Sequence, residues 1–390
     1  MAVPLIYSVR SVAVRKGSSA MAVVGIALVV VVLVVLLALA AGFRKAVASS
    51  GSPQNIIVLR KGADAELQSQ VTRQTARVIQ ELPIVANDEK GLPLFCKETV
   101  VILARQKKDG GETSVTVRGA DRQSPVVHAG LRIIEGRWYT IGSDEAVVGR
   151  AIAHRMENFG VGQTITIGKH HWKIVGLFEA GGSSLESELW CDVDLVQSAF
   201  HRTVFQSLLF RASGDAQAAL ERIQKEIDAD PRLHSAQAKL ETKYYEEQSR
   251  LMSDLITTLG GLLTIIMGVG AVVGAMNTMY AAVSQRKREI GCLLAIGFTP
   301  RSIWMAFMAE SLVLSALGAI LGCGLSLLFN GLQTGTTNWA TFSETAFEFL
   351  ITPRILITAA IVALILGFVG GVAPAFRAAR MKVVDALRRA

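Results

Sequence analysis

Charged side chains are missing from long stretches of this chain of 390 residues, although charged residues make up 18% of it. None occurs in 20–42, 255–283 or 355–376, and 303–329 contains only Glu310. A helix needs about 20 mainly apolar residues to cross the hydrocarbon core of a bilayer. Helices this long and apolar are not expected in a small soluble domain. The sequence therefore predicts a membrane protein with four spanning helices.

Catalytic and metal-binding motifs are also missing. The four cysteines form no CxxC or Cys/His pattern, and no GxSxG, HExxH or clustered-carboxylate motif is present. The phosphate-binding motif GxxxxGK[ST] is absent too, so we expect ATP to be bound elsewhere. A disulfide between Cys96 and Cys191 is possible in an oxidising compartment, but no spacing supports it. We therefore predict no enzyme activity, metal site or cofactor in this chain.

The histidines and several acidic pairs give no sign of catalysis. His170 and His171 are adjacent and would point to opposite faces of a strand, which suits no shared metal ion. We interpret the histidines as surface or turn residues, and Asp144-Glu145 and Glu186/Glu188 as solvated faces. The six histidines are His128, His154, His170, His171, His201 and His234.

Basic residues in short loops predict the orientation in the membrane, because such residues are retained in the cytoplasm. The 284–302 loop and the tail after residue 376 are basic, whereas 330–353 contains no Lys or Arg. Four crossings then place the N-terminus inside and the large segment 44–250 outside, in the periplasm of a bacterium with two membranes. The net charge of +8 lies largely beside membrane segments, so it does not indicate nucleic-acid binding.

The first apolar stretch has an alternative interpretation as a signal peptide, because basic residues precede it and Leu39-Ala40-Ala41-Gly42 resembles a cleavage site. The apolar run exceeds 20 residues, which is longer than the usual core of a signal peptide. We therefore favour an uncleaved anchor.

The segment between the first two crossings is expected to fold as an α+β domain. Two helical patterns cover 64–81 and 215–229, the second ending at Asp230-Pro231. Residues 236–254 contain no Gly or Pro, so we expect one continuous helix, a stalk, from 236 to 283, with a hinge near Ser253 as the alternative. The expected strands cover Asn55–Leu59, Thr99–Leu103, Ser114–Val117, Gln163–Ile167 and Trp172–Phe178.

Several motifs resemble those of FtsX-like ABC transporter permeases with a MacB-type periplasmic core domain. Arg288-Glu289-Ile290-Gly291, followed by Ala295-Ile296-Gly297, resembles the REIG…AIG signature of these permeases. Leu294 stands where many members have Arg or Lys, and Lys382-Val383-Val384 replaces a usual proline. Further similar segments are Glu135–Trp138, Ala146–Gly149, Val161–Ile165, Ile174–Gly176, Ala373–Arg380 and Asp385–Arg388.

This resemblance implies a type VII ABC transporter in which two permeases, identical or different, pair with a separate ATPase dimer that binds ATP and Mg. Because few residues precede the first crossing, no fused ATPase is expected. The resemblance also implies dimer contacts along the first two crossings. In the second crossing, Gly270 and Gly274 have a close-packing spacing that Gly318 and Gly322 of the third share. From its composition alone, the 284–302 segment is either an amphipathic helix or a simple loop. The resemblance implies that it is the ATPase-coupling helix. Its implied contact residues are Arg286, Arg288, Glu289, Ile290, Gly291, Leu293, Leu294, Ala295 and Gly297.

The expected fold class is a membrane α-helical protein with an extracytoplasmic α+β domain, located in the bacterial inner membrane. Its expected segments are 1–19 (cytoplasmic), 20–43 (first crossing), 44–235 (periplasmic core), 236–283 (stalk and second crossing), 284–302 (coupling helix), 303–329 (third crossing), 330–354 (outer loop), 355–376 (fourth crossing) and 377–390 (cytoplasmic tail).

The resemblance implies export or extraction of a lipid, lipoprotein, peptide or antibiotic by mechanotransmission, with a periplasmic adaptor and an outer-membrane channel as possible partners. The alternative is FtsX-like signalling that activates a cell-wall hydrolase without transport. The absence of a row of charges in the crossings agrees with a mechanism that needs no polar channel. For Glu310 we expect a packing or interfacial role.

Overall fold

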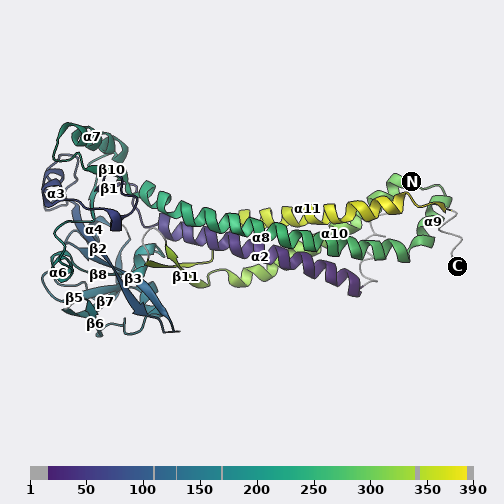
Figure 1. Ribbon diagram of the computed structural model, residues 1–390, viewed down its shortest axis with the longest axis horizontal. Helices are drawn as coiled ribbons and strands as arrows, with labels where there is room; N and C mark the ends of the chain where they lie inside the picture. Colours follow the sequence, from purple (N-terminus) through teal and green to yellow (C-terminus); the bar gives the residue numbers. More distant parts are fainter. Residues whose placement is uncertain (1–15, 109, 129, 168–169, 339–342, 384–390) are drawn as a thin grey trace. The chain divides into compact units, whose positions relative to one another are not determined.

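The computed structural model describes residues 16–108, 110–128, 130–167, 170–338 and 343–383 (Figure 1). These residues form two compact units, which we describe separately. The helical unit comprises Met1–Ala41, Leu255–Leu332 and Phe349–Ala390, and the α/β unit comprises Gly42–Asp254 and Gln333–Glu348. Most of the expected cytoplasmic segment 1–19 and the motif Asp385–Arg388 lie outside the described residues.

In the described part of the chain, four helices are long and apolar enough to cross a membrane. Each contains all or most of one of the stretches that are poor in charge, which confirms the predicted number of apolar helices. They are α2 (Lys16–Ala48), α8 (Glu241–Gln285), α10 (Pro300–Ser326) and α11 (Pro353–Ala379). A short 3₁₀ turn, η3 (Leu327–Phe329), follows α10.

The sequence Thr-Pro begins both α10 and α11. The hydroxyl oxygens of Thr299 and Thr352 accept hydrogen bonds from backbone N–H groups in the first turn, as N-cap residues do. Pro300 and Pro353 occupy the first helical position, where a missing N–H costs no hydrogen bond. The starts of these helices are therefore determined locally.

Small residues allow the helices of the helical unit to approach closely. A Cβ added at Gly318 would lie 2.9 Å from the Ile26 side chain, and one added at Gly322 would lie 2.7 Å from Val30. The α10 helix therefore packs directly against α2. The Ser311 hydroxyl donates to the Gly367 carbonyl oxygen at 2.6 Å, which joins α10 to α11. Close approach through glycine and serine is typical of helix packing in membranes.

The α/β unit is built on one mixed sheet with the strand order β10-β1-β9-β2-β3-β8-β5-β7-β4, and β6 pairs with β7. Most pairs are antiparallel, whereas β3 pairs with β8 and β5 with β7 in parallel. The strands are β1 (Asn55–Arg60), β2 (Phe95–Gln106), β3 (Glu112–Ala120), β4 (Arg132–Gly136), β5 (Glu145–Gly149), β6 (Thr164–Ile167), β7 (His170–Glu179), β8 (Glu188–Asp192), β9 (Ser207–Arg211) and β10 (Ala236–Leu240).

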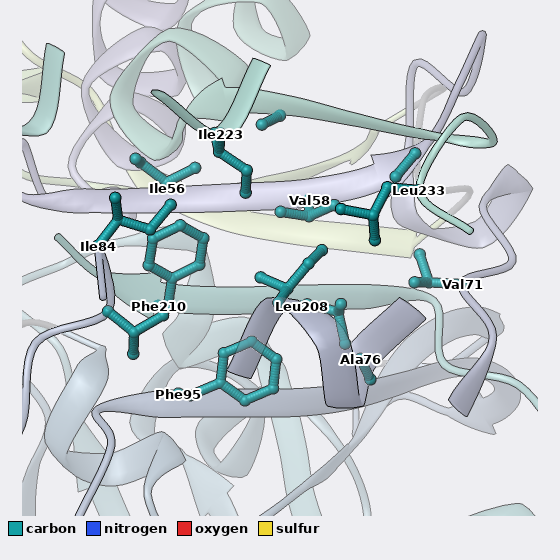
Figure 2. Packing of buried hydrophobic residues seen from close by; sticks show 14 of the residues in the cluster. Ile56, Val58, Val71, Ala76, Ile84, Phe95, Leu208, Phe210, Ile223 and Leu233 are labelled. Atoms are coloured by element: carbon teal, nitrogen blue, oxygen red, sulfur yellow. The ribbon is translucent and has the colours of Figure 1, made fainter. Parts of the chain in front are cut away.

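Short helices connect and cover these strands, and the sheet packs two main apolar cores. One core lies between β1, β9 and helices α3 and α7; Figure 2 shows Ile56, Phe210 and Ile223 meeting there. The other surrounds Trp172 and Val148. The helices are η1 (Glu66–Gln68), α3 (Arg73–Gln80), α4 (Ser124–Val127), α5 (Arg150–Arg155), η2 (Ser184–Ser187), α6 (Val193–Ala199) and α7 (Ala216–Ala229).

All five predicted strands and the helix at 215–229 are confirmed. The helix predicted over 64–81 is confirmed only in its second half, because the chain forms η1 and then α3, which begins only after residue 72. Between them, Val71 pairs with Phe205 as an isolated β-bridge, which the helical pattern did not reveal. Thr72 then caps α3 by accepting a hydrogen bond from the Thr75 N–H.

The predicted start of the stalk helix at residue 236 is also wrong. Residues Ala236–Leu240 form β10, and α8 begins at Glu241. These residues favour a helix by propensity, but β10 pairs with β1 across its whole length. Because tertiary pairing overrides a weak local preference, the helix begins five residues later. From Glu241 to Gln285 the chain forms a single helix, and the alternative of a hinge near Ser253 stays open.

The expected outer loop 330–354 contains a β-hairpin, formed by β11 (Gln333–Asn338) and β12 (Ser343–Glu348), that belongs to the α/β unit. The Glu344 carboxylate, almost fully buried, pairs with Lys107 at 2.9 Å and with Arg155. The Ala346 N–H donates to the Ser187 hydroxyl at 2.9 Å. Describing this segment as a loop was therefore incomplete.

The disulfide that the sequence left open is not formed. Cys96 on β2 and Cys191 on β8 are both buried and free. Burial raises the pKa of both thiols well above their ordinary value, so both stay protonated and act as small apolar side chains.

Candidate functional site

The segment expected to couple to an ATPase lies between α8 and α10 and forms a short helix, α9 (Lys287–Ala295). Its end is fixed by glycine, since Gly297 has φ of +101°, a left-handed conformation that other residues avoid. The Phe298 N–H donates to the Leu293 carbonyl at 3.1 Å, and the Gly297 N–H donates to the Leu294 carbonyl at 3.2 Å. These two bonds form a Schellman motif, which ends the helix sharply.

One face of α9 is anchored within the helical unit. Ile290 is only 2% exposed and packs with Met279 and Val283 of α8, Phe307 of α10 and Ala375 of α11. Gly291 is also buried, and Leu293 and Leu294 are half-buried. The expectation that the Ile290–Leu294 face packs on the ATPase therefore needs correction, because Ile290 is buried against helices of its own chain.

Arg286 is likewise turned inward. Its guanidinium NH1 lies 3.2 Å from Glu310 Oε2, and both side chains are nearly buried. A carboxylate in a membrane-spanning helix is costly without a partner, so Arg286 explains how Glu310 is tolerated in α10. This agrees with the packing role expected for Glu310.

The other face of α9 is exposed. Ile296 is 72% exposed and lies next to charged residues of α9. Sequence reasoning named neither Ile296 nor Cys292 as site residues, although the spacing of Arg288, Cys292 and Ile296 places them on one helical face. The exposed residues are Lys287, Arg288, Glu289, Cys292, Ala295, Ile296 and Gly297.

The glycines of α8 differ in their surroundings. A Cβ added at Gly260 or Gly268 would touch Leu36 of α2 or Leu366 of α11, respectively. One added at Gly270 or Gly274 would meet no described atom within 4 Å. The face with Gly270 and Gly274 is therefore not occupied by the described helices of its own chain, and their role in a dimer stays a prediction.

The α/β unit contains a buried charged cluster that sequence reasoning missed. Arg118 of β3 is 2% exposed and binds three carboxylates, at 2.8 Å (Glu66), 2.6 Å (Glu98) and 2.7 Å (Glu188). Five hydrogen bonds use all five N–H groups of the guanidinium. The prediction that Glu186 and Glu188 are solvated is wrong, because both side chains are buried.

The cluster continues to His128, which is buried and not at the surface as predicted. Its Nε2 lies 2.7 Å from Glu98 Oε1. Burial alone raises the pKa of the Glu98 carboxyl, but the charges of His128 and Arg118 lower it to about 2. Burial lowers the pKa of His128, but Glu98 and Glu241 outweigh this effect and raise it above 6.5. These side chains come from elements far apart in sequence, so no local pattern could have revealed the cluster.

A metal centre is not indicated in the part of the chain that the structure describes, where no three His, Cys, Asp or Glu side chains are placed to hold an ion. The carboxylates that bind Arg118 are instead satisfied by one another's partners and by neighbouring polar groups, whereas His128 Nδ1 has no hydrogen-bond partner among the described residues. Ser207 donates to Glu66 at 2.5 Å, and the Trp190 indole donates to Glu188 at 2.9 Å. The cluster is therefore a structural network rather than an open ligand site.

The fold, the apolar helices and α9 can now be compared with known proteins. Residues 19–229 match the MacB-like periplasmic core domain family, and residues 261–383 match the FtsX-like permease C-terminal family. The first match alone covers more than half of the chain. The chain belongs to the MacB/FtsX-type ABC transporter permeases. The family assignment suggested by the sequence motifs is thereby confirmed.

Three curated relatives illustrate the extent of this permease family. The uncharacterized ABC transporter permease YknZ of Bacillus subtilis is 24% identical over 98% of this chain and 97% of its own length. The macrolide export protein MacB of Pasteurella multocida is 28% identical over 66% of this chain. The pyoverdine export protein PvdT of Pseudomonas entomophila is 27% identical over 95% of it. The match spans only 40% of that MacB and 57% of that PvdT, both named ATP-binding/permease proteins.

Solved domains of two such permeases are also similar to the chain. The extracellular domain of YknZ from Gram-positive bacteria is 13% identical and has a TM-score of 0.36, covering 47% of this chain and 99% of that domain. The periplasmic region of MacB from Actinobacillus actinomycetemcomitans is 14% identical with a TM-score of 0.37, covering 53% and 94%.

Proposed function

We propose that this permease couples ATP hydrolysis by a separate ATPase dimer to a conformational change in its α/β unit, and so drives export or extraction by mechanotransmission. The observation that carries the proposal is the two-sided environment of α9. Its exposed face offers Arg288, Glu289 and Ile296 to a partner, while Ile290 is packed among three long helices. A force applied to the exposed face therefore reaches α8, α10 and α11 directly.

The long helix α8 supplies the route to the α/β unit. It contributes Leu255–Gln285 to the helical unit and Glu241–Asp254 to the α/β unit within one unbroken helix. At about 1.5 Å per residue, such a helix transmits a displacement that a flexible linker would absorb. Among the described apolar helices, the buried carboxylate Glu310 is paired with Arg286, which supports a mechanism without a polar channel.

The proposal includes partners and a location. ATP and Mg bind to the ATPase, and a second permease, identical or different, packs on the open face of α8 at Gly270 and Gly274. The α/β unit lies in the periplasm of a cell with an inner membrane. Its substrate is a lipid, lipoprotein, peptide or antibiotic, received with an adaptor and an outer-membrane channel. In the alternative, FtsX-like signalling, ATP hydrolysis instead activates a cell-wall hydrolase and no substrate moves.

The proposed location can be tested with one native thiol. Cys292 on α9 is exposed, whereas Cys96 and Cys191 are buried. A membrane-impermeant maleimide added to cells with a permeable outer membrane should label a Lys225→Cys variant on the exposed face of α7, whereas Cys292 should react only after the inner membrane is opened. Equal labelling of both thiols in intact cells would contradict the proposed orientation.

The ATPase contact can be tested at Ile296. Because this side chain is 72% exposed, Ile296→Asp should leave the fold intact but place a charge in the proposed interface. A central apolar contact in an interface contributes about 2 kcal/mol or more, so we expect at least about a 30-fold weaker association with the ATPase. The measurement is co-purification of the ATPase with the tagged chain, followed by its ATPase rate.

Ile296→Leu is the matched control and should retain the partner, because it keeps the apolar volume. An undiminished ATPase yield with Ile296→Asp would show that the partner does not bind this face of α9.

The same purified complex distinguishes transport from signalling. ATP-dependent release of a candidate substrate from the membrane supports transport, whereas activation of a hydrolase without release supports signalling.

A further inference from the structure

His128 lies at the point where the start of α8 meets the sheet. Its imidazole is buried directly after α4 and stands between two carboxylates. Nε2 is 2.7 Å from Glu98 Oε1, and Nδ1 faces Glu241 Oε1 at 3.7 Å. Nδ1 has no hydrogen-bond partner among the described residues. With Nε2–H directed at Glu98, Nδ1 carries a hydrogen only when the ring is charged, so the attraction between His128 and Glu241 is strongest in that state.

Glu241 joins three segments through one carboxylate. It is the first residue of α8, and its Oε2 accepts hydrogen bonds from the Ser52 N–H at 2.8 Å and the Asn55 amide at 2.9 Å. Ser52 follows the end of α2, and Asn55 begins β1. The two ends that enter the α/β unit from the long helices α2 and α8 are therefore held together at Glu241.

The interior around His128 has more negative than positive groups. Glu66, Glu98, Glu188 and Glu241 share it with Arg118 and His128, so when the imidazolium loses its proton, Arg118 is the described cation that still binds these carboxylates. The rings of His128 and Trp190 (β8) lie in a T-shaped arrangement with centroids 5.0 Å apart, and Arg211 of β9 donates to the Val126 and Val127 carbonyls. The charged groups that face His128 directly or through Arg118 are Glu98 (β2), Glu241 (α8), Arg118 (β3), Glu66 (η1) and Glu188 (β8).

We propose that protonated His128 is a latch that holds Glu241, and with it the start of α8 and the segment after α2, against the sheet, and that loss of its proton releases them. When the ring is neutral, Glu98 and Glu241 repel each other across it, with no cation between them. Glu241 is then drawn toward water, which its position at a helix start allows. The latch itself does not depend on the proposed transport function.

The direction of the pH response follows from the pKa of His128, which its carboxylate partners raise above 6.5. A group whose pKa is higher in the folded state stabilises that state fully below 6.5 and loses this contribution as the pH rises through the folded value. Burial raises the pKa of Glu241 above 4.5, so protonation of this carboxyl likewise stabilises the folded state at low pH. The latch is therefore closed in acid and opens from neutral to alkaline pH.

Hydrogen exchange of the full chain in detergent micelles tests this latch. Exchange of peptides covering 49–56 and 239–250 is measured by mass spectrometry from pH 6 to pH 9, after correction for intrinsic rates. We expect protection to fall several-fold across one midpoint that lies above 6.5, the ordinary pKa of histidine. In His128→Gln, both peptides should exchange at the released rate at every pH. His154→Gln is the control, because His154 is exposed on α5, and it should keep the wild-type profile.

Glu241→Gln provides a test that does not require His128 to be changed. The amide oxygen can still accept from Ser52 and Asn55, but the charge that favours the imidazolium is lost. The midpoint should therefore move down by about one pH unit. A purely structural role would change protection equally at all pH values. The proposal is overturned if wild-type protection is flat from pH 6 to pH 9, or if a pH step persists in His128→Gln. An unshifted midpoint in Glu241→Gln also overturns it. If His128→Gln does not fold, the result with Glu241→Gln decides alone.

Discussion

Arg118→Met is expected to lower the free energy of unfolding of the α/β unit by about 3–5 kcal/mol, the usual cost of leaving buried charges without their partner. The guanidinium now gives all five of its N–H groups to Glu66, Glu98 and Glu188. Methionine has a similar length but leaves these carboxylates facing one another. Chemical unfolding of the full chain in micelles, followed by the fluorescence of Trp190 and Trp172, measures the loss.

The pH dependence of this defect has a defined sign. In the wild type, the pKa of Glu98 is lowered to about 2, so its ion pairs stabilise the fold above about pH 4.5 and are lost as the pH falls toward 2. Without Arg118, one of the two charges that lower the pKa of Glu98 is lost, and burial shifts this pKa back up. The defect of Arg118→Met should therefore be larger at pH 8 than at pH 5.

Arg132→Met is the matched control, because Arg132 pairs with Glu179 at the surface and is 74% exposed. Exposed pairs contribute about 0–1 kcal/mol, so this variant should unfold almost as the wild type does. If Arg118→Met were no less stable than Arg132→Met, the buried cluster would have no structural importance.

Local destabilisation of the α8 helix should weaken the functional coupling between the two units. Thr258 and Leu259 are exposed on this helix, so the double change Thr258→Gly/Leu259→Gly removes no buried contact. Each glycine disfavours the helix by about 1 kcal/mol relative to alanine. Together they raise the population of unwound helix about 30-fold. We expect most of the ATP-dependent change in hydrogen exchange of the α/β unit to be lost, as measured in the complex with the ATPase.

The variant Thr258→Ala/Leu259→Ala removes the same side chains and keeps the helix stiff, so it should respond to ATP like the wild type. Both variants should bind the ATPase normally, because α9 is unchanged. A full response in the double-glycine variant would mean that the displacement does not travel along α8.

Local patterns predicted much of this fold because they depend on nearby residues alone. The apolar helices follow from runs without charge, and β1 and β7 follow from β-branched and alternating residues. The start of α8 was misplaced, since Ala236–Leu240 has a helical composition but pairs with β1. The hairpin of β11 and β12 was missed because its polar residues resemble a loop.

The functional residues were predicted less completely, for a physical reason. Motifs located α9 but could not show that Ile290 faces inward and Ile296 outward, because that depends on how three other helices pack. The buried cluster was not predicted at all. Glu98, Arg118 and Glu241 lie on three different elements, and only the folded sheet brings their charges together.

The membership of the β11–β12 hairpin in the α/β unit has a practical consequence for anyone who wishes to express that unit alone. A recombinant fragment cut at residues 42 and 254 would lack the counter-ion of Lys107 and Arg155 and the strand next to Ser187. The fragment would expose the surface of the α/β unit that the hairpin covers, and it would tend to self-associate there. A soluble version of the complete α/β unit therefore needs residues 333–348 joined to it through an artificial linker.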